Sequence, residues 1–209
     1  MAESSSTGPV MSGAEAEKIA DDVENHSSMT DLVATNPPSP FIVRWVRRLV
    51  AEFPAHPRAL DMAMGRGRHA IVMAAAGFHV VGIDIQFSGI AEARQSARAE
   101  GLDISGVCAD LTNLRLPHER FHLIVVTRYL DRSAFPAMRD ALVPGGVLLF
   151  ETFTTRQREH GRGPTSRAHL LDPGELRLLA RGMDLLFDEE CVYPDAVARI
   201  AARRRQERM

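Results

Sequence analysis

An acid and several small residues follow the first short apolar stretch of the chain. This stretch begins at Arg58 and leads into Asp61-Met62-Ala63-Met64-Gly65-Arg66-Gly67. The alternating small residues allow a sharp backbone turn, so that a ligand can approach the N–H groups at the start of the next helix. A glycine turn alone is equally typical of a tight strand-to-helix connection, so further residues are needed to indicate a site.

Two further acids stand at the ends of the next two apolar stretches. Asp84 ends the second stretch, where a carboxylate can accept hydrogen bonds from both hydroxyls of a ribose. Asp110 follows the third, where it can accept one from the amino group of an adenine. Each acid alone is typical of an ordinary loop. Together with the glycine turn, they describe a site shaped for adenosine.

The order of the expected elements brings these residues together. Short apolar runs alternate with helical segments of about ten residues. The expected strands are 58–63, 78–85, 104–109, 121–127 and 147–151, and the expected helices are 41–53, 68–76 and three that start at Ser88, Ser133 and Asp172. Segments 184–192 and 197–202 fit a helix as well as a strand. This alternation predicts an α/β fold with a parallel sheet, helices on both faces and the ligand at the carboxyl ends of the strands.

With these motifs, the chain resembles the class I methyltransferases that use S-adenosylmethionine (SAM), and more narrowly their tellurite-resistance-type branch and its bacterial relatives. The resemblance runs from about Pro38 to Ala202. It lies in LDMAMGRGRHA (60–70), GFHVVGIDI (77–85), CADL (108–111), FHLIVVTRYL (121–130), PGGVLLFETF (144–153) and GPTSRAHLLDPGEL (163–176). It implies a Rossmann-like, seven-stranded, mostly parallel sheet in the order 3-2-1-4-5-7-6.

The resemblance also implies a set of site residues. Those expected to bind SAM are Asp61, Ala63, Gly65, Gly67, Arg68, Asp84, Ile85, Ala109, Asp110, Leu111 and Thr127. Arg128 and Tyr129, after the fourth strand, are expected beside the methyl group, where they would orient the acceptor as catalytic residues. Glu151 is a candidate polar floor. Ordinary salt bridges and packing are the alternative roles of these three side chains, and no metal is expected.

The chain departs from the family pattern at three points. Ala63 stands where the family usually has glycine, and Met64 where it often has cysteine; the bulkier Met64 is expected to alter the floor of the SAM pocket. The helix between the third and fourth strands is nearly absent. Arg66 and Arg68 begin a helix, where the helix dipole disfavours cations. The methionine carboxylate of SAM would resolve that conflict, as would pairing with acids elsewhere or exposure to water.

Composition excludes several classes of function. The formal net charge is −2 over 209 residues, which indicates neither a nucleic-acid nor a membrane partner. Cys108 and Cys191 stand apart from any metal-ligand spacing, so no zinc site or disulfide is expected. No apolar stretch is long enough to span a membrane, and no secretory signal is seen. A cytoplasmic enzyme, as a monomer or homodimer, is the expectation.

The two ends of the chain are expected to lie outside the enzyme domain. Residues 1–35 carry seven acids and one lysine with few large apolar side chains, which predicts disorder. The methyltransferase domain is expected over 36–203, with Asn36-Pro37-Pro38-Ser39 as a linker. Residues 204–209 are expected to form a basic, solvated tail, and contact with RNA or acidic lipid is the alternative.

Three other functions compete with this interpretation. A nicotinamide-dependent oxidoreductase also has a glycine turn and an acid after the second strand, but it does not call for Asp110, and its fingerprint has a neutral residue where Asp61 stands. A nucleic-acid methyltransferase would carry its Asn-Pro-Pro motif after Val126, where the chain reads Thr-Arg-Tyr-Leu. A non-enzymatic SAM-binding protein is the third.

The acceptor is predicted from chain length and arginines. The chain has no added recognition domain, and four arginines in the site-facing segments suit an anionic small molecule: Arg128, Arg132, Arg156 and Arg162. An oxyanion, a thiol or another soft nucleophile needs no strong general base for SN2 methyl transfer, which depends chiefly on alignment. The loop 154–171 is expected to be either a lid over the site or a plain surface loop.

Overall fold

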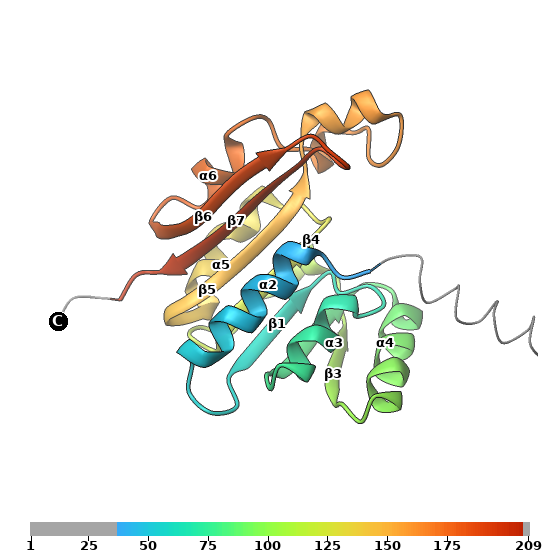
Figure 1. Ribbon diagram of the computed structural model, residues 1–209, viewed down its shortest axis with the longest axis vertical. Coiled ribbons are helices and arrows are strands. Elements are labelled where there is room, and N and C mark those ends of the chain that lie inside the picture. Colours follow the sequence, from blue (N-terminus) through green and yellow to red (C-terminus); the bar gives the residue numbers. More distant parts are fainter. Residues whose placement is uncertain (1–36, 207–209) are drawn as a thin grey trace, which may run out of the picture. The chain divides into compact units, whose positions relative to one another are not determined.

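The computed structural model describes residues 37–206, in which seven strands form one sheet with helices on both faces (Figure 1). Their order, β3-β2-β1-β4-β5-β7-β6, confirms the predicted one. The strands are β1 Arg58–Met62, β2 His79–Asp84, β3 Ile104–Cys108, β4 Phe121–Thr127, β5 Leu142–Phe153, β6 Met183–Cys191 and β7 Val197–Arg204. All pairs from β3 to β5 are parallel, whereas β7 runs antiparallel to both neighbours. The predicted disorder of 1–35 lies outside the described residues.

Three helices cover one face of the sheet: α2 Pro40–Leu49, α3 Arg68–Ala75 and α4 Phe87–Ala99. The predicted apolar stripe of the first helix is confirmed, since Phe41, Trp45 and Leu49 are buried in this core. A 3₁₀ turn, Val50–Glu52, extends that helix toward β1. Burial of apolar side chains between these helices and the strands is the main source of stability here.

The opposite face is covered less completely. Two short helices, α5 Phe135–Ala141 and α6 Glu175–Leu179, pack on the strands from β4 onward. Between β3 and β4 the described chain has only a 3₁₀ turn, Leu111–Asn113, in place of a full helix. This confirms the predicted shortening, and it leaves part of β2 and β3 without a helix above them.

Segments 184–192 and 197–202, whose pattern fits a helix as well as a strand, form the hairpin of β6 and β7. Their alanines and arginines do not decide between helix and strand, but pairing of β7 with β5 over seven residues fixes the extended form. The expected solvated tail is corrected for its first arginines, and residues 207–209 lie outside the described part of the chain. Arg203, Arg204 and Arg205 pair with Glu52, Glu119 and Asp184, and β7 itself runs to Arg204.

The predicted helix starts are displaced by one to three residues. Helix α4 begins before Ser88, at Phe87, because the N–H of Gln86 is held by the Asp84 carboxylate at 2.9 Å. Ser133 lies in a 3₁₀ turn that Asp131 caps, ahead of α5. Helix α6 begins only at Glu175, whose carboxylate accepts the N–H of Asp172, so Asp172 is not its cap.

The described residues contain no helix that is both long and apolar enough to cross a membrane.

Candidate functional site

The glycine turn joins β1 to α3 in a left-handed backbone conformation. Ala63, Gly65 and Gly67 have φ values of 55°, 53° and 74°. The space beside Gly65 is open, because a Cβ built there would meet no atom within 4 Å. A Cβ on Gly67 would instead lie 2.6 Å from the Cβ of Ala93 in α4. Gly65 therefore leaves room for a ligand, whereas Gly67 is small because two helices pack closely.

Met64 does not have the effect expected of it. Its side chain is buried in the core under α3 and α4, and it fills the space above Gly82 of β2, where a Cβ would come within 2.0 Å of the methionine sulfur. The glycine in β2 makes room for the larger residue. The open side of the turn is therefore unaffected by the departure from the family pattern.

Asp84 holds the turn as well as facing the predicted ribose site. One carboxylate oxygen accepts the N–H of Gly65 at 2.8 Å, and the other accepts that of Gln86 at 2.9 Å. A carboxylate offers about four acceptor positions, so two are left for ribose hydroxyls. Asp84 thus couples the position of the glycine turn to the end of β2.

Asp61 is buried at the end of β1 with one oxygen, Oδ2, that meets no hydrogen-bond donor among the described residues. Burial raises the pKa of its carboxyl to about 7, and a backbone hydrogen bond from Ala70 and the charge of Arg68 only partly oppose this. An unsatisfied buried carboxylate oxygen is costly, and a cationic donor group on a ligand would satisfy it.

The carboxylate of Asp110, the third acid, accepts hydrogen bonds from nearby residues of its own loop. Asp110 is exposed, and its carboxylate accepts hydrogen bonds from the backbone and side chain of Thr112 and from the side chain of Asn113. These bonds lower the pKa of its carboxyl. Ile85 is exposed at the end of β2, and Ala109 and Leu111 flank Asp110, half-buried. The predicted contact of this group with adenine stays a prediction.

A buried network below the site includes residues that sequence reasoning missed. The Nε2 atom of His69 accepts the N–H of Ser39 at 3.0 Å, and its Nδ1 lies 3.2 Å from the hydroxyl of Thr127. Burial, followed by the charges of Arg68 and Arg128, lowers the pKa of His69 to about 3. The ring is therefore neutral, with its proton on Nδ1 directed at Thr127.

Ser39 extends this network to the far half of the sheet. Its hydroxyl donates to Glu151 at 2.9 Å, and Glu151 also receives the guanidinium of Arg199 at 2.5 Å. Glu151 is thus buried and already paired, and its role as a polar floor stays a prediction. The sequence offered one sign that His69 lies inside. His69 stands four residues before Met73 on the same helix, so the two share a helix face, and Met73 is buried.

The two arginines at the start of α3 behave differently. Arg66 is exposed and pairs with Glu92 at 3.0 Å, so it does not need a ligand. Arg68 is half-buried, and the pKa of its guanidinium is lowered by burial and then by the charge of Arg128. The charges of Glu151 and Asp61 oppose this lowering, so Arg68 already has acids near it at the start of α3.

A cavity of about 750 Å³ lies at the carboxyl ends of β4 and β5. The predicted catalytic pair, Arg128 and Tyr129, lies in its wall, and Thr112 brings it next to the loop that begins at Asp110. The other lining residues are Leu130, Asp131, Arg132, Ser133, Phe153, Pro164, Ala168 and His169.

Arg128 and Tyr129 each lie among residues that constrain or bury them. Arg128 has a left-handed backbone with φ 56°, its N–H donates to the carbonyl of Glu151, and its guanidinium lies 5.8 Å from the ring centre of Phe153. Burial, then the charges of Asp131 and Asp110, raise the pKa of the Tyr129 phenol. Tyr129 is therefore a neutral hydrogen-bond donor near pH 7.

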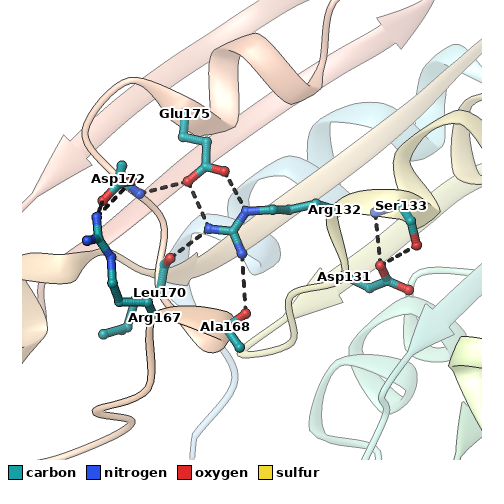
Figure 2. A network of polar contacts seen from close by, with 8 residues as sticks. All are labelled: Asp131, Arg132, Ser133, Arg167, Ala168, Leu170, Asp172 and Glu175. Carbon is teal, nitrogen blue, oxygen red and sulfur yellow. Dashed lines mark hydrogen bonds and ion pairs between the residues drawn. The ribbon is translucent and has the colours of Figure 1, made fainter.

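Arg132 binds the end of the loop 154–171, which we call the roof because part of it lines the cavity. Figure 2 shows the contacts of Arg132. Its guanidinium contacts both carboxylate oxygens of Glu175, at 2.5 and 2.9 Å, and donates to the carbonyls of Ala168 and Leu170. The loop 154–171 also bridges to itself, between Thr154 and Leu171. It is neither a plain surface loop nor an unattached lid: Pro164, Ala168 and His169 line the cavity beneath it.

Most of the arginines predicted to receive an anionic acceptor are engaged elsewhere. Arg132 serves the roof, Arg156 lies 4.0 Å from Glu159, and Arg162 contacts Asp195 at 2.8 Å and the carbonyl of Pro194. That prediction is corrected for these three. Arg128 lines the cavity together with Arg132, and its guanidinium lies 5.8 Å from the ring centre of Phe153.

The turn and the acids fit SAM. The open space at Gly65 admits the ligand, the lone Oδ2 of Asp61 suits its ammonium group, and Arg68 suits its carboxylate. Residues 37–206 hold no group of three or more histidine, cysteine or acidic side chains placed to bind a metal ion. Cys108 and Cys191 are free.

Comparison with known proteins matches the chain to methyltransferases. A family model described as a methyltransferase domain matches residues 59–146. A demethylmenaquinone methyltransferase from Thermus thermophilus is 33% identical over 120 residues, which cover 53% of this chain and 54% of that protein. The chain thus spans about half the length of this curated relative.

Solved structures share the fold at low sequence identity. A SAM-dependent methyltransferase from Clostridium acetobutylicum has a TM-score of 0.66 at 13% identity, over 88% of this chain and 99% of that one. One from Methanosarcina mazei has 0.63 at 19%, over 82% and 100%. TehB from Haemophilus influenzae has 0.63 at 19%, over 76% and 61%.

Proposed function

We propose that this chain, which carries a class I SAM-dependent methyltransferase domain, transfers a methyl group from SAM to a small-molecule acceptor. The observation that carries the proposal is the cavity at the carboxyl ends of β4 and β5, lined in part by the loop 154–171. It adjoins Thr112 of the cofactor loop on one side and Arg128 on the other. Its volume of about 750 Å³ lies within the range of pockets that enclose small ligands.

Within this proposal, each group of residues has a separate task. Asp61, Gly65 and Asp84 hold the cofactor, which supplies an electrophilic methyl group when bound. Arg128 and Tyr129 position the acceptor, whose lone pair forms the new bond to carbon while the carbon–sulfur pair stays on sulfur, leaving S-adenosylhomocysteine. The roof held by Arg132 excludes water and limits the motion of the acceptor.

An anionic or soft nucleophile suits this wall. Arg128 offers a charge, Tyr129 a neutral phenol, and neither is placed as a strong base. The resemblance of the sequence to the tellurite-resistance-type branch favours a metalloid oxyanion or a thiol. Methyl transfer to such acceptors needs alignment more than proton removal.

A second candidate acceptor is a hydroquinone ring. The relative from Thermus thermophilus is named for demethylmenaquinone, and the cavity here has apolar walls from Leu130, Phe153, Pro164 and Ala168. Arg128 would then face a phenolate oxygen beside the methylated carbon.

Release of S-adenosylhomocysteine during a screen of acceptors tests the proposal. The panel contains metalloid oxyanions, thiols, amines, carboxylates, a soluble hydroquinone, RNA and protein lysate. Turnover with one class of small molecule is the expected result, and turnover confined to RNA or protein would overturn it. Tyr129→Phe should lower turnover about fivefold with SAM affinity unchanged, since one neutral hydrogen bond is lost. The control is Tyr193→Phe, because Tyr193 is 84% exposed and lies outside the cavity.

A further inference from the structure

The short connection between β3 and β4 leaves an apolar sheet face open on the side away from α3 and α4. On this face Ile83 of β2 is buried, Val81 of β2 is half-buried, and Val107 of β3 is 41% exposed. Ile104 of β3, by contrast, is buried under the helices on the other side. An apolar strand face that water reaches is unusual in a folded domain, and such surfaces commonly bind something.

The open face is the floor of a second cavity, of about 640 Å³. Leu114 and Leu116, from the connection itself, form one wall, and Phe121 at the start of β4 closes another side. The remaining lining residues are Arg58, His79, Val80, Asp103, Ser105, Arg115, Pro117 and Arg120. None of these residues belongs to the acceptor cavity, and the volume again suits a small ligand.

Charge is distributed unevenly along this second cavity. Arg58 and Arg120 meet at the amino-terminal ends of β1 and β4, where Arg58 Nε donates to the carbonyl of Arg120 at 2.8 Å. Arg115 lies on the same rim, and Asp103 is the acid that lines the cavity. Within residues 37–206 no ion pair is recorded for the side chains of Arg115 and Arg120. The rim is therefore cationic, while the floor along the strands is apolar.

We propose that this cavity binds an amphipathic carboxylate. Its anionic head would lie at the arginine rim, and its hydrocarbon body would lie along β2 and β3 beneath Leu114 and Leu116. Guanidinium groups pair well with carboxylates, and the apolar floor gains by the removal of water. The site opens toward the amino-terminal ends of the strands, opposite to the cofactor acids at their carboxyl ends. It is a binding site additional to methyl transfer.

Titration calorimetry with decanoate, below its micellar concentration, tests the inference on the full chain. Saturable binding is expected, at least tenfold tighter than that of decyltrimethylammonium or 1-decanol. The double variant R115E/R120E should bind decanoate at least tenfold more weakly. Arg98→Glu is the charge-matched control on α4, outside this cavity, and should bind as the unaltered protein does. Val107→Asp, a change at an exposed site, should also weaken binding.

Three results would overturn the inference: no saturable binding of decanoate, equal binding of the anion and the cation, or undiminished binding by R115E/R120E. SAM is titrated into the same samples. Retained SAM binding by the double variant would show that the two sites are separate and that the protein is folded, and failure at this cavity would leave methyl transfer standing.

Discussion

The two ends of the candidate site, the proposed cofactor end and the proposed acceptor end, are built in different ways. At the cofactor end, strands β1 and β2 each place an acid next to backbone N–H groups, and Asp84 holds the glycine turn through a contact only nineteen residues long in sequence. At the acceptor end, the wall depends on side-chain pairs between distant segments, such as Arg132 with Glu175 and Glu151 with Arg199. A generic ligand can be bound by local backbone geometry, whereas a specific acceptor cavity needs long-range side-chain contacts.

The buried network joins these two ends. His69 from α3 contacts Thr127 at the end of β4, and Ser39 connects His69 to Glu151 of β5. The domain-family match ends at residue 146, before Glu151 and the roof. Arg128 and Tyr129 lie within the matched segment, whereas Glu151 and the loop 154–171 lie beyond it.

Loss of the Asp84 carboxylate should have the largest effect. In Asp84→Ala, the ribose hydroxyls and the N–H groups of Gly65 and Gln86 lose their acceptor, and SAM affinity should fall about a hundredfold. Asp84→Asn keeps one acceptor oxygen and should lose less. Calorimetric titration of SAM measures both. An unchanged dissociation constant in folded Asp84→Ala would remove the acid from the cofactor end.

Loosening the roof should act on the acceptor end alone. Arg132→Ala frees the carbonyls of Ala168 and Leu170 and should lower kcat/KM for the acceptor about tenfold. SAM affinity should stay unchanged, because Arg132 does not reach the turn. Glu175→Gln, which leaves the arginine but weakens its anchor, should show a smaller effect in the same direction. Equal losses in acceptor and cofactor binding would contradict the division of the site.

The buried acid Asp61 should give a dependence of stability on pH. The raised pKa of Asp61, about 7, keeps its carboxyl protonated in the fold, whereas in the unfolded chain it ionises near pH 4. The free energy of unfolding without ligand should therefore fall, by about 1 kcal/mol per pH unit, as pH rises from 4 to 7, and level off above. Asp61→Asn should lack this contribution. Urea unfolding of both proteins across this window measures the difference, and parallel curves would contradict the raised pKa.

Much of the cofactor end was predictable from sequence because its geometry is local. Positive φ values favour glycine, so Gly65 and Gly67 mark the turn, and the continuous apolar run of β4 marks a central strand. Asp84 follows its strand in the expected place. Separate roles for Gly65 and Gly67 were not predictable, since the packing of Gly67 depends on Ala93 of another helix.

The acceptor end was less predictable because its contacts join distant residues. The pairing of Arg132 with Glu175 spans 43 residues, so Arg132 was mistaken for an acceptor ligand. The hairpin of β6 and β7 takes its extended form from pairing with β5 rather than from its own composition. The role of His69 likewise depends on Ser39 and Thr127, which approach it only in the folded chain.

Parallel calorimetric titrations of the unaltered protein with SAM, S-adenosylhomocysteine and NAD test the central claim most directly. Binding of both sulfur nucleosides at one saturable site, with no binding of NAD, is the predicted result, because Asp61, Asp84 and the open turn at Gly65 suit SAM. Binding of NAD, with none of SAM at millimolar concentration, would contradict it.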